Sequence, residues 1–219
     1  MSITWLEPID PQDVDAEVTL AGRRHPMRMV TMAAAAEVGA WSGDTPRQVE
    51  ATFDALAGEW HTRHSPGRTA ALGDALDRGV LTEDWTASGD VWLELGAGDG
   101  AASATIAARA PRLVAIELSA RMLAESPDDG VMRVRADAAA LPLDDHAASC
   151  VVLMNMLLFP TELDRVLAPD GRLLWLSSRG PATPIYLSAE QVAAALPGRW
   201  GGVAGQHGTA HWAVLSRLG

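Results

Sequence analysis

The stretch that decides the fold is Val91–Gly100, which reads VWLELGAGDG. An apolar run of strand length passes directly into a glycine-rich turn, and a segment of helical character follows. Glycine is needed in such a turn because the backbone bends sharply and has to approach a ligand without a Cβ in the way. Backbone N–H groups and the positive end of the following helix then face the ligand. The stretch therefore predicts a nucleotide-type site between a strand and a helix.

The glycine pattern alone does not distinguish a dinucleotide such as NAD from another nucleotide-type cofactor. Residues 96–101 also satisfy the dinucleotide fingerprint G-x-G-x-x-A, and Glu117 lies about 20 residues further on, where an acid would hold a ribose. Glu94 stands inside the first strand, where it suits a ligand that carries an ammonium group or an adjacent backbone N–H. Asp137 follows the third strand and could accept a hydrogen bond from an adenine amine at the carboxyl edge of the sheet. A dinucleotide site has no obvious use for these two acids.

After residue 90 the chain alternates short apolar runs with helix-like segments, which is typical of βαβ units and a parallel sheet. The predicted strands are Val91–Leu95, Leu113–Glu117, Val131–Arg135, Ser149–Met154, Arg172–Ser177, Gly202–Gln206 and His211–Ser216. The last two would close the sheet as a hairpin. A capping box at Ser188–Gln191 predicts the helix that precedes this hairpin.

The first 88 residues are predicted to be helical, with little strand signal. A capping box at Thr45–Gln48 indicates a helix start, and one face of that helix is formed by Val49, Phe53, Leu56 and Trp60. A second helix is expected over Arg68–Arg78. We therefore divide the chain into an N-terminal helical cap or lid, residues 1–88, and a cofactor-binding core, residues 89–219.

Four motifs in order carry a resemblance to a known family: Leu93–Gly100; Ala115–Ser119 with Met122 and Leu123; Ala136, Asp137 and Leu141–Asp144; and Arg165–Arg172. Through them the segment 91–177 resembles the class I S-adenosylmethionine-dependent methyltransferases. It is most similar to the small-molecule branch that includes the ubiquinone and menaquinone C-methyltransferases. The resemblance implies an α/β fold with a Rossmann-like, mostly parallel seven-stranded sheet. It also implies S-adenosylmethionine as cofactor and a small-molecule methyl acceptor.

The resemblance further implies a role for each residue of the cofactor site. The turn formed by Gly96, Ala97, Gly98 and Gly100 would pack against the methionine part of the cofactor, and Glu94 would help to order that turn. Glu117 would accept hydrogen bonds from both ribose hydroxyls. The adenine would be held by Leu118, Asp137 and the backbone of Ala138, and Asn155 would lie near the amino-acid part. No metal site is expected.

The acceptor side departs from the family, because only residues 155–168 separate the fourth strand from the turn into the fifth. One customary wall of the substrate pocket is therefore reduced. Methyl transfer to O, N or C requires a general base only if the accepting atom loses a proton. The candidates for that base are His64, at the end of the lid helix, and Tyr186, although a capping or packing role competes for each.

Three alternatives to a methyltransferase stay open. The chain could bind S-adenosylmethionine without transferring a methyl group, as a regulatory subunit or a non-methylating enzyme. An NAD-dependent oxidoreductase and a pure interaction domain are the other two.

Composition narrows the partners and the compartment. The 219 residues carry 17 basic and 28 acidic side chains, a net charge of −11, which opposes nucleic-acid binding and favours a small neutral or cationic acceptor. The acidic start is unlike a signal peptide, and no apolar stretch approaches the roughly 20 residues that span a bilayer. We therefore expect a cytoplasmic protein without membrane contact. Its lone cysteine, Cys150, cannot form an internal disulfide, and the cap could contribute to a homodimer.

Overall fold

Strand β2 (Val91–Leu95) lies at the centre of the structure, a computed structural model that describes residues 2–37, 41–85 and 87–219. Four of its five residues are buried, as expected for a strand that is covered on both faces. It pairs in parallel with β3 (Arg112–Glu117) on one side and with β5 (Ala148–Met154) on the other. The glycine turn follows β2 at its carboxyl end. The predicted nucleotide-type site therefore lies at the carboxyl edge of the sheet, near its centre.

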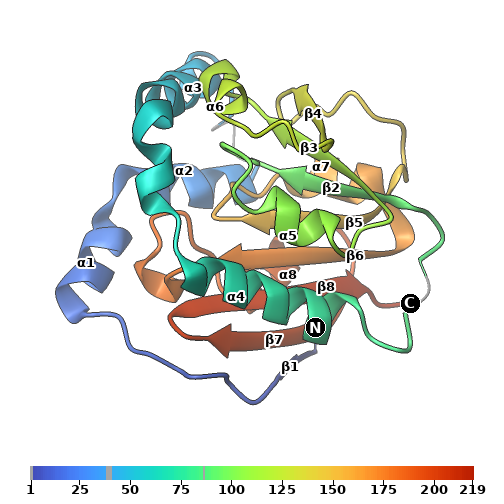
Figure 1. The fold of residues 1–219 in the computed structure, drawn as a ribbon. Coiled ribbons are helices and arrows are strands. Elements are labelled where there is room, and N and C mark those ends of the chain that lie inside the picture. The colour runs from blue at the N-terminus through green and yellow to red at the C-terminus, as the bar shows by residue number, and fades with distance from the viewer. Residues whose placement is uncertain (1, 38–40, 86) are drawn as a thin grey trace.

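The sheet has eight strands in the order β1-β7-β8-β6-β5-β2-β3-β4 (Figure 1). The strands not yet named are β1 (Ile3–Trp5), β4 (Met132–Arg135), β6 (Leu167–Ser177), β7 (Trp200–His207) and β8 (Ala210–Arg217). Only β8 runs antiparallel to its neighbours, which confirms the mostly parallel sheet with a C-terminal hairpin. The predicted count of seven is wrong, because β1 adds an eighth strand along β7.

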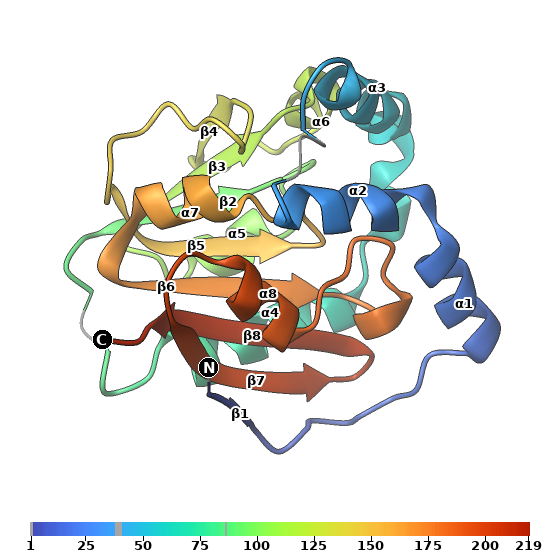
Figure 2. The ribbon, with the colours of Figure 1, turned by 180° about the vertical axis from the view of Figure 1, so that it is seen from behind.

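Helices cover both faces of the sheet. One face carries α4 (Pro66–Ala75) and α5 (Ser103–Ala107), and the other carries α2 (Pro26–Ala35), α7 (Pro160–Val166) and α8 (Ala189–Ala195) (Figures 1 and 2). Two separate clusters of buried apolar side chains lie between these helices and the sheet. The sheet is therefore buried on both faces, as a parallel α/β fold requires.

The remaining helical elements are α1 (Ala16–Arg24), α3 (Thr45–Leu56), α6 (Ala120–Ala124), the 3₁₀ turns η1 (Ala57–Arg63) and η3 (Gly180–Ala182), and the π turn η2 (Leu76–Val80). Helix α3 begins at Thr45 with Pro46 in its first turn, but no side chain caps it, so the capping box predicted there is wrong. The second one is confirmed, since Ser188 and Gln191 bond reciprocally at the start of α8.

The first 88 residues do more than cover the site. Strand β1 belongs to the central sheet, and α4 packs against β7 and β8 with Leu72 and Leu76 fully buried. Helices α1 to α3 and η1 lie towards the end of the sheet where β2 and β5 end (Figures 1 and 2). No helix in the described ranges is long and apolar enough to cross a membrane.

Candidate functional site

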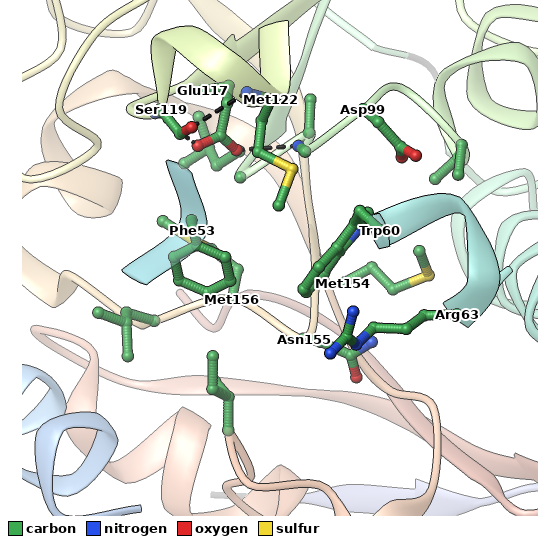
Figure 3. Close-up of a pocket in the computed structure, with 18 of the residues that line it drawn as sticks. Phe53, Trp60, Arg63, Asp99, Glu117, Ser119, Met122, Met154, Asn155 and Met156 are labelled. Carbon is green, nitrogen blue, oxygen red and sulfur yellow. Dashed lines mark hydrogen bonds between the residues drawn. The ribbon is translucent and has the colours of Figure 1, made fainter. Parts of the chain in front are cut away.

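A cavity of about 690 Å³ opens at the carboxyl ends of β2, β3 and β5, beneath α3 and η1 (Figure 3). Open parallel sheets bind their ligands at this edge, and the volume lies within the range of cofactor pockets. Of the predicted cofactor residues the cavity is lined by Glu94, Gly96, Ala97, Gly98, Glu117, Leu118, Asp137, Ala138 and Asn155. Gly100 belongs to the same turn but does not line the cavity. The structure thus gathers nearly all of the residues that the sequence singles out.

The turn at residues 96–100 has the geometry that glycine permits. Gly96, Gly98 and Gly100 have φ values of 70°, 59° and 81°, in the left-handed region. The N–H groups of Gly96 and Ala97 both donate to the carbonyl of Ile116, which folds the turn back onto β3. A Cβ on Gly96 would lie 2.5 Å from Sδ of Met156. Any other residue at position 96 would therefore be strained and would also crowd the cavity.

Glu117 connects the end of β3 to the glycine turn. One carboxylate oxygen accepts the N–H of Gly98 at 2.9 Å and the other accepts the N–H of Ser119 at 2.8 Å (Figure 3). Burial raises the pKa of Glu117, and the backbone hydrogen bonds oppose that effect. A carboxylate has about four acceptor positions, so these bonds do not use all of its acceptor capacity.

Glu94 is fully buried beneath the turn. Its Oε2 accepts a hydrogen bond from Oγ of Ser103 at 2.6 Å, so it holds the start of α5 rather than an N–H of the turn. Burial raises the pKa of Glu94 to about 7, although the Ser103 hydroxyl favours the charged form. A cationic group in the cavity would favour that charged form further.

Asp137 is bonded to a residue that the sequence did not suggest. Both of its carboxylate oxygens accept from Nε1 of Trp41, at 3.0 and 2.8 Å, and Oδ1 also accepts the N–H of Ala139. The Trp41 ring meets Phe159 edge-on, with centroids 5.1 Å apart. Nothing in the local pattern around Trp41 links it to Asp137, which is 96 positions away.

Asn155 ties together the ends of two strands. It has a positive φ of 53°, its N–H donates to the carbonyl of Leu176, and its Oδ1 accepts the N–H of Ser178. These bonds fix the short segment between β5 and α7 against the end of β6. The side chain of Asn155 thus lies at the cavity edge that the sequence predicted.

The two candidates for a general base have different surroundings. Nε2 of His64 lies 2.8 Å from a carboxylate oxygen of the buried Asp99, so the end of η1 is joined to the glycine turn. Asp99 was not predicted, although its place inside the turn was a signal. Tyr186 does not line the cavity; its ring contacts Arg28 and His211 instead. The geometry therefore gives no support to a catalytic role for Tyr186.

An aromatic wall faces the glycine turn across the cavity (Figure 3). Phe53 and Trp60 meet edge-on with centroids 5.6 Å apart, and the guanidinium of Arg63 lies 5.0 Å above the Trp60 ring. Asp54, next to Phe53, accepts hydrogen bonds from the Ser119 hydroxyl and the Arg121 N–H. Helix α3 is thereby attached to α6, immediately after the acid that ends β3.

Comparison with known proteins agrees with this geometry. Residues 93–175 match the family model described as a methyltransferase domain. This segment is therefore similar to a methyltransferase domain. The chain is also 32% identical over 155 residues to a demethylmenaquinone methyltransferase of Clavibacter sepedonicus. That alignment covers 64% of this chain and 62% of the relative's length.

Two solved structures share the fold of the methyltransferase domain. DhpI in complex with SAH has a TM-score of 0.59 and 20% identity, over 77% of this chain and 94% of DhpI. The [4+2]-cyclase SpnF has a TM-score of 0.56 and 21% identity, over 71% of this chain and 75% of SpnF. The expected resemblance and the Rossmann-like, mostly parallel fold are therefore confirmed. Within the described ranges no group of three or more His, Cys, Asp or Glu is placed to hold a metal ion.

Proposed function

We propose that this protein transfers the methyl group of S-adenosylmethionine to a small molecule bound in the same cavity. The proposal rests on the glycine turn and Glu117, which are joined by the hydrogen bond from the Gly98 N–H to the Glu117 carboxylate. A buried carboxylate lies beside backbone that lines the cavity at the carboxyl edge of the sheet. The methyltransferase family match adds the reaction class.

The residues present fit the cofactor. Glu117 would accept the ribose hydroxyls with its free acceptor positions, and Leu118 and Ala138 would flank the adenine. Asp137 could take an adenine amine only by sharing or releasing the Trp41 indole, because both of its oxygens accept from Trp41. The glycine turn and Asn155 would lie against the amino-acid part, with Glu94 beneath. The cofactor, when bound, supplies a methyl group on a positively charged sulfur.

The chain's own contribution is to hold the acceptor in line and to exclude water. Phe53 and Trp60 cover the cavity from α3 and η1, and Met154 and Met156 provide apolar surface at the end of β5. His64 would remove a proton where the acceptor atom carries one. Asp99 would orient its imidazole and stabilise the charge that develops on it.

The test is transfer of a radiolabelled methyl group from S-adenosylmethionine to candidate small molecules. We expect incorporation with the wild-type protein and at least a tenfold loss with Glu117→Ala, because hydrogen bonds to a charged group are removed. His64→Gln should lower the rate only for acceptors that lose a proton. Absence of transfer to any acceptor, with cofactor binding intact, would contradict the proposal.

That last outcome would favour the second candidate, a cofactor-binding protein with another reaction. The SpnF fold illustrates that this architecture does not decide the chemistry. In the structure only residues 155–166, which include α7, separate β5 from β6, and this short connection supports the second candidate. Cytoplasmic location, the absence of nucleic-acid binding and a homodimer stay predictions.

A further inference from the structure

Three arginines at the cavity have no acidic partner among the described residues. They are Arg63 at the end of η1, Arg68 in the first turn of α4, and Arg179, two residues after the end of β6. Nine of the other arginines form ion pairs with aspartate or glutamate. In a chain with 28 acidic and 17 basic side chains, unpaired arginines at one site call for an explanation.

The three arginines are close enough to affect one another. Burial lowers the pKa of Arg68, and the positive charges of Arg179 and Arg63 lower it further. Arg63 also stacks on Trp60, with its guanidinium on the side of the cavity opposite Glu117 (Figure 3). Repulsion of this kind is relieved when an anion binds between the guanidinium groups.

The acids of the cavity do not serve as that anion. Glu94 is bonded to Ser103, Asp99 to His64, and Asp137 to Trp41, while Glu117 accepts two backbone N–H groups. The remaining acid, Glu50, is paired with Arg135. Each of these acids therefore has its own hydrogen-bond or ion-pair partner, and none of them pairs with Arg63, Arg68 or Arg179.

Apolar side chains adjoin this positive charge. Phe53, Trp60, Met156 and Ile185 line the same cavity. A ligand that satisfies both features has an apolar body and an anionic end. One guanidinium can hold one carboxylate with two hydrogen bonds, so pairing one arginine with the cofactor's own carboxylate still leaves two.

We propose that the methyl acceptor is an amphipathic anion whose carboxylate or phosphate group is held by Arg68 and Arg179 beside Arg63. This inference rests on the proposed methyl transfer and names the substrate class of that same cavity. It replaces the neutral or cationic acceptor expected from the net charge. A net charge averages over the whole surface, whereas the binding site is set by its local charges.

The experiment measures the affinity of matched probes by isothermal titration calorimetry. The probes are 1-naphthoate and the neutral 1-naphthamide, with 1-naphthyl phosphate as a second anion. They are titrated into the protein alone and into protein saturated with S-adenosylhomocysteine, which already supplies the cofactor's carboxylate. The variants are Arg68→Gln with Arg179→Gln, and Arg199→Gln as the control. The control removes one arginine charge at the opposite end of the sheet, because Trp200 pairs with Arg217 and Ser177 with His211.

We expect an anionic probe to bind at least about tenfold more tightly than the amide, since charge-assisted bonds to arginine are lost with the neutral probe. The double variant should lose this preference while it keeps the melting temperature and the S-adenosylhomocysteine affinity. The control should behave as wild type. Tighter binding of the naphthyl phosphate identifies a phosphate as the group recognised, and tighter binding of naphthoate identifies a carboxylate.

Equal affinities for the anionic and neutral probes would overturn the proposal, as would no binding of either at millimolar concentration. A preference that survives in the double variant would also overturn it. If the double variant loses S-adenosylhomocysteine affinity and keeps the probe preference, the arginines hold the cofactor and the acceptor assignment is wrong. Failure of the wild-type protein to bind S-adenosylhomocysteine would contradict the proposed function separately, and the probes would then be compared on the protein alone.

Discussion

At the residue scale, Gly96 shows how the backbone limits the sequence. A side chain at position 96 would meet two separate penalties. The φ of 70° is left-handed, and a Cβ there would lie 2.5 Å from Sδ of Met156. Gly130 carries only the first, with a φ of 80° and nothing within 4 Å of its Cβ position. A matched pair of alanine substitutions can therefore separate the conformational cost from the crowding.

We predict that Gly130→Ala lowers the free energy of unfolding by about 1 to 2 kcal/mol, the cost of a left-handed residue with a side chain. Gly96→Ala should cost more, and it should also weaken S-adenosylhomocysteine binding. Urea denaturation and titration calorimetry measure the two effects. Equal losses of stability in both variants would mean that Met156 moves away freely and that crowding contributes nothing.

A buried acid gives the second prediction at this scale. The pKa of Glu94 is raised from an ordinary 4.5 to about 7 by burial, so the folded state binds more protons than the unfolded chain between these values. The stabilising contribution is complete below the unfolded pKa and is lost as the pH rises through the folded pKa. The free energy of unfolding should therefore fall between about pH 5 and pH 8 by about 1 to 3 kcal/mol.

Glu94→Gln should flatten this pH dependence, because glutamine has no charge to bury and can still accept from Ser103. Urea denaturation of both proteins across that pH range measures the difference. Identical slopes for wild type and variant would show that Glu94 does not titrate there.

At the element scale, Asp54 is the side chain of α3 that bonds this helix to the start of α6. Asp54 accepts from the Ser119 hydroxyl and the Arg121 N–H, and the same Ser119 donates its N–H to Glu117. The aromatic wall and the expected ribose acid are thus connected through a single turn. Without that connection α3 and η1 would open more often, since little else links α3 to α6.

We predict that Asp54→Ala speeds amide hydrogen exchange over residues 45–63 and weakens S-adenosylhomocysteine binding by about three- to tenfold, the loss of one or two hydrogen bonds to a charge. Glu59→Ala is the control, because Glu59 is an exposed acid on η1 in the same segment. Amide exchange rates that change equally in Asp54→Ala and Glu59→Ala would contradict the role of Asp54 in holding α3 to α6.

The elements with a strong apolar pattern could be predicted from the sequence, and those defined by distant contacts could not. All seven predicted strands are present, and most of them are apolar runs bounded by turn residues, although the edge strand β4 is not buried. Strand β1 was missed because three residues give no periodic signal and its partner β7 lies about 200 positions away. The same reason hides the bond from Trp41 to Asp137 and the place of Arg68 near Arg63 and Arg179, two arginines that the sequence already offers as carboxylate ligands.

At the scale of the whole molecule, the site lies between a regular sheet and an irregular N-terminal segment. The sheet side carries the recognisable motifs, since strand ends and the glycine turn place Glu94 and Glu117 in a fixed geometry. The opposite side is built by α3, η1 and the loop after β6, where sequence patterns are weak. Cofactor chemistry is therefore easier to predict than the acceptor.

The central claim is that this cavity binds S-adenosylmethionine through Glu117, and titration calorimetry with S-adenosylhomocysteine tests it most directly. We predict saturable one-to-one binding to the wild-type protein in the micromolar range typical of cofactors. The affinity should fall at least about tenfold in folded Glu117→Ala protein. Saturable binding of NAD with none of S-adenosylhomocysteine, or an unchanged affinity in the variant, would contradict it.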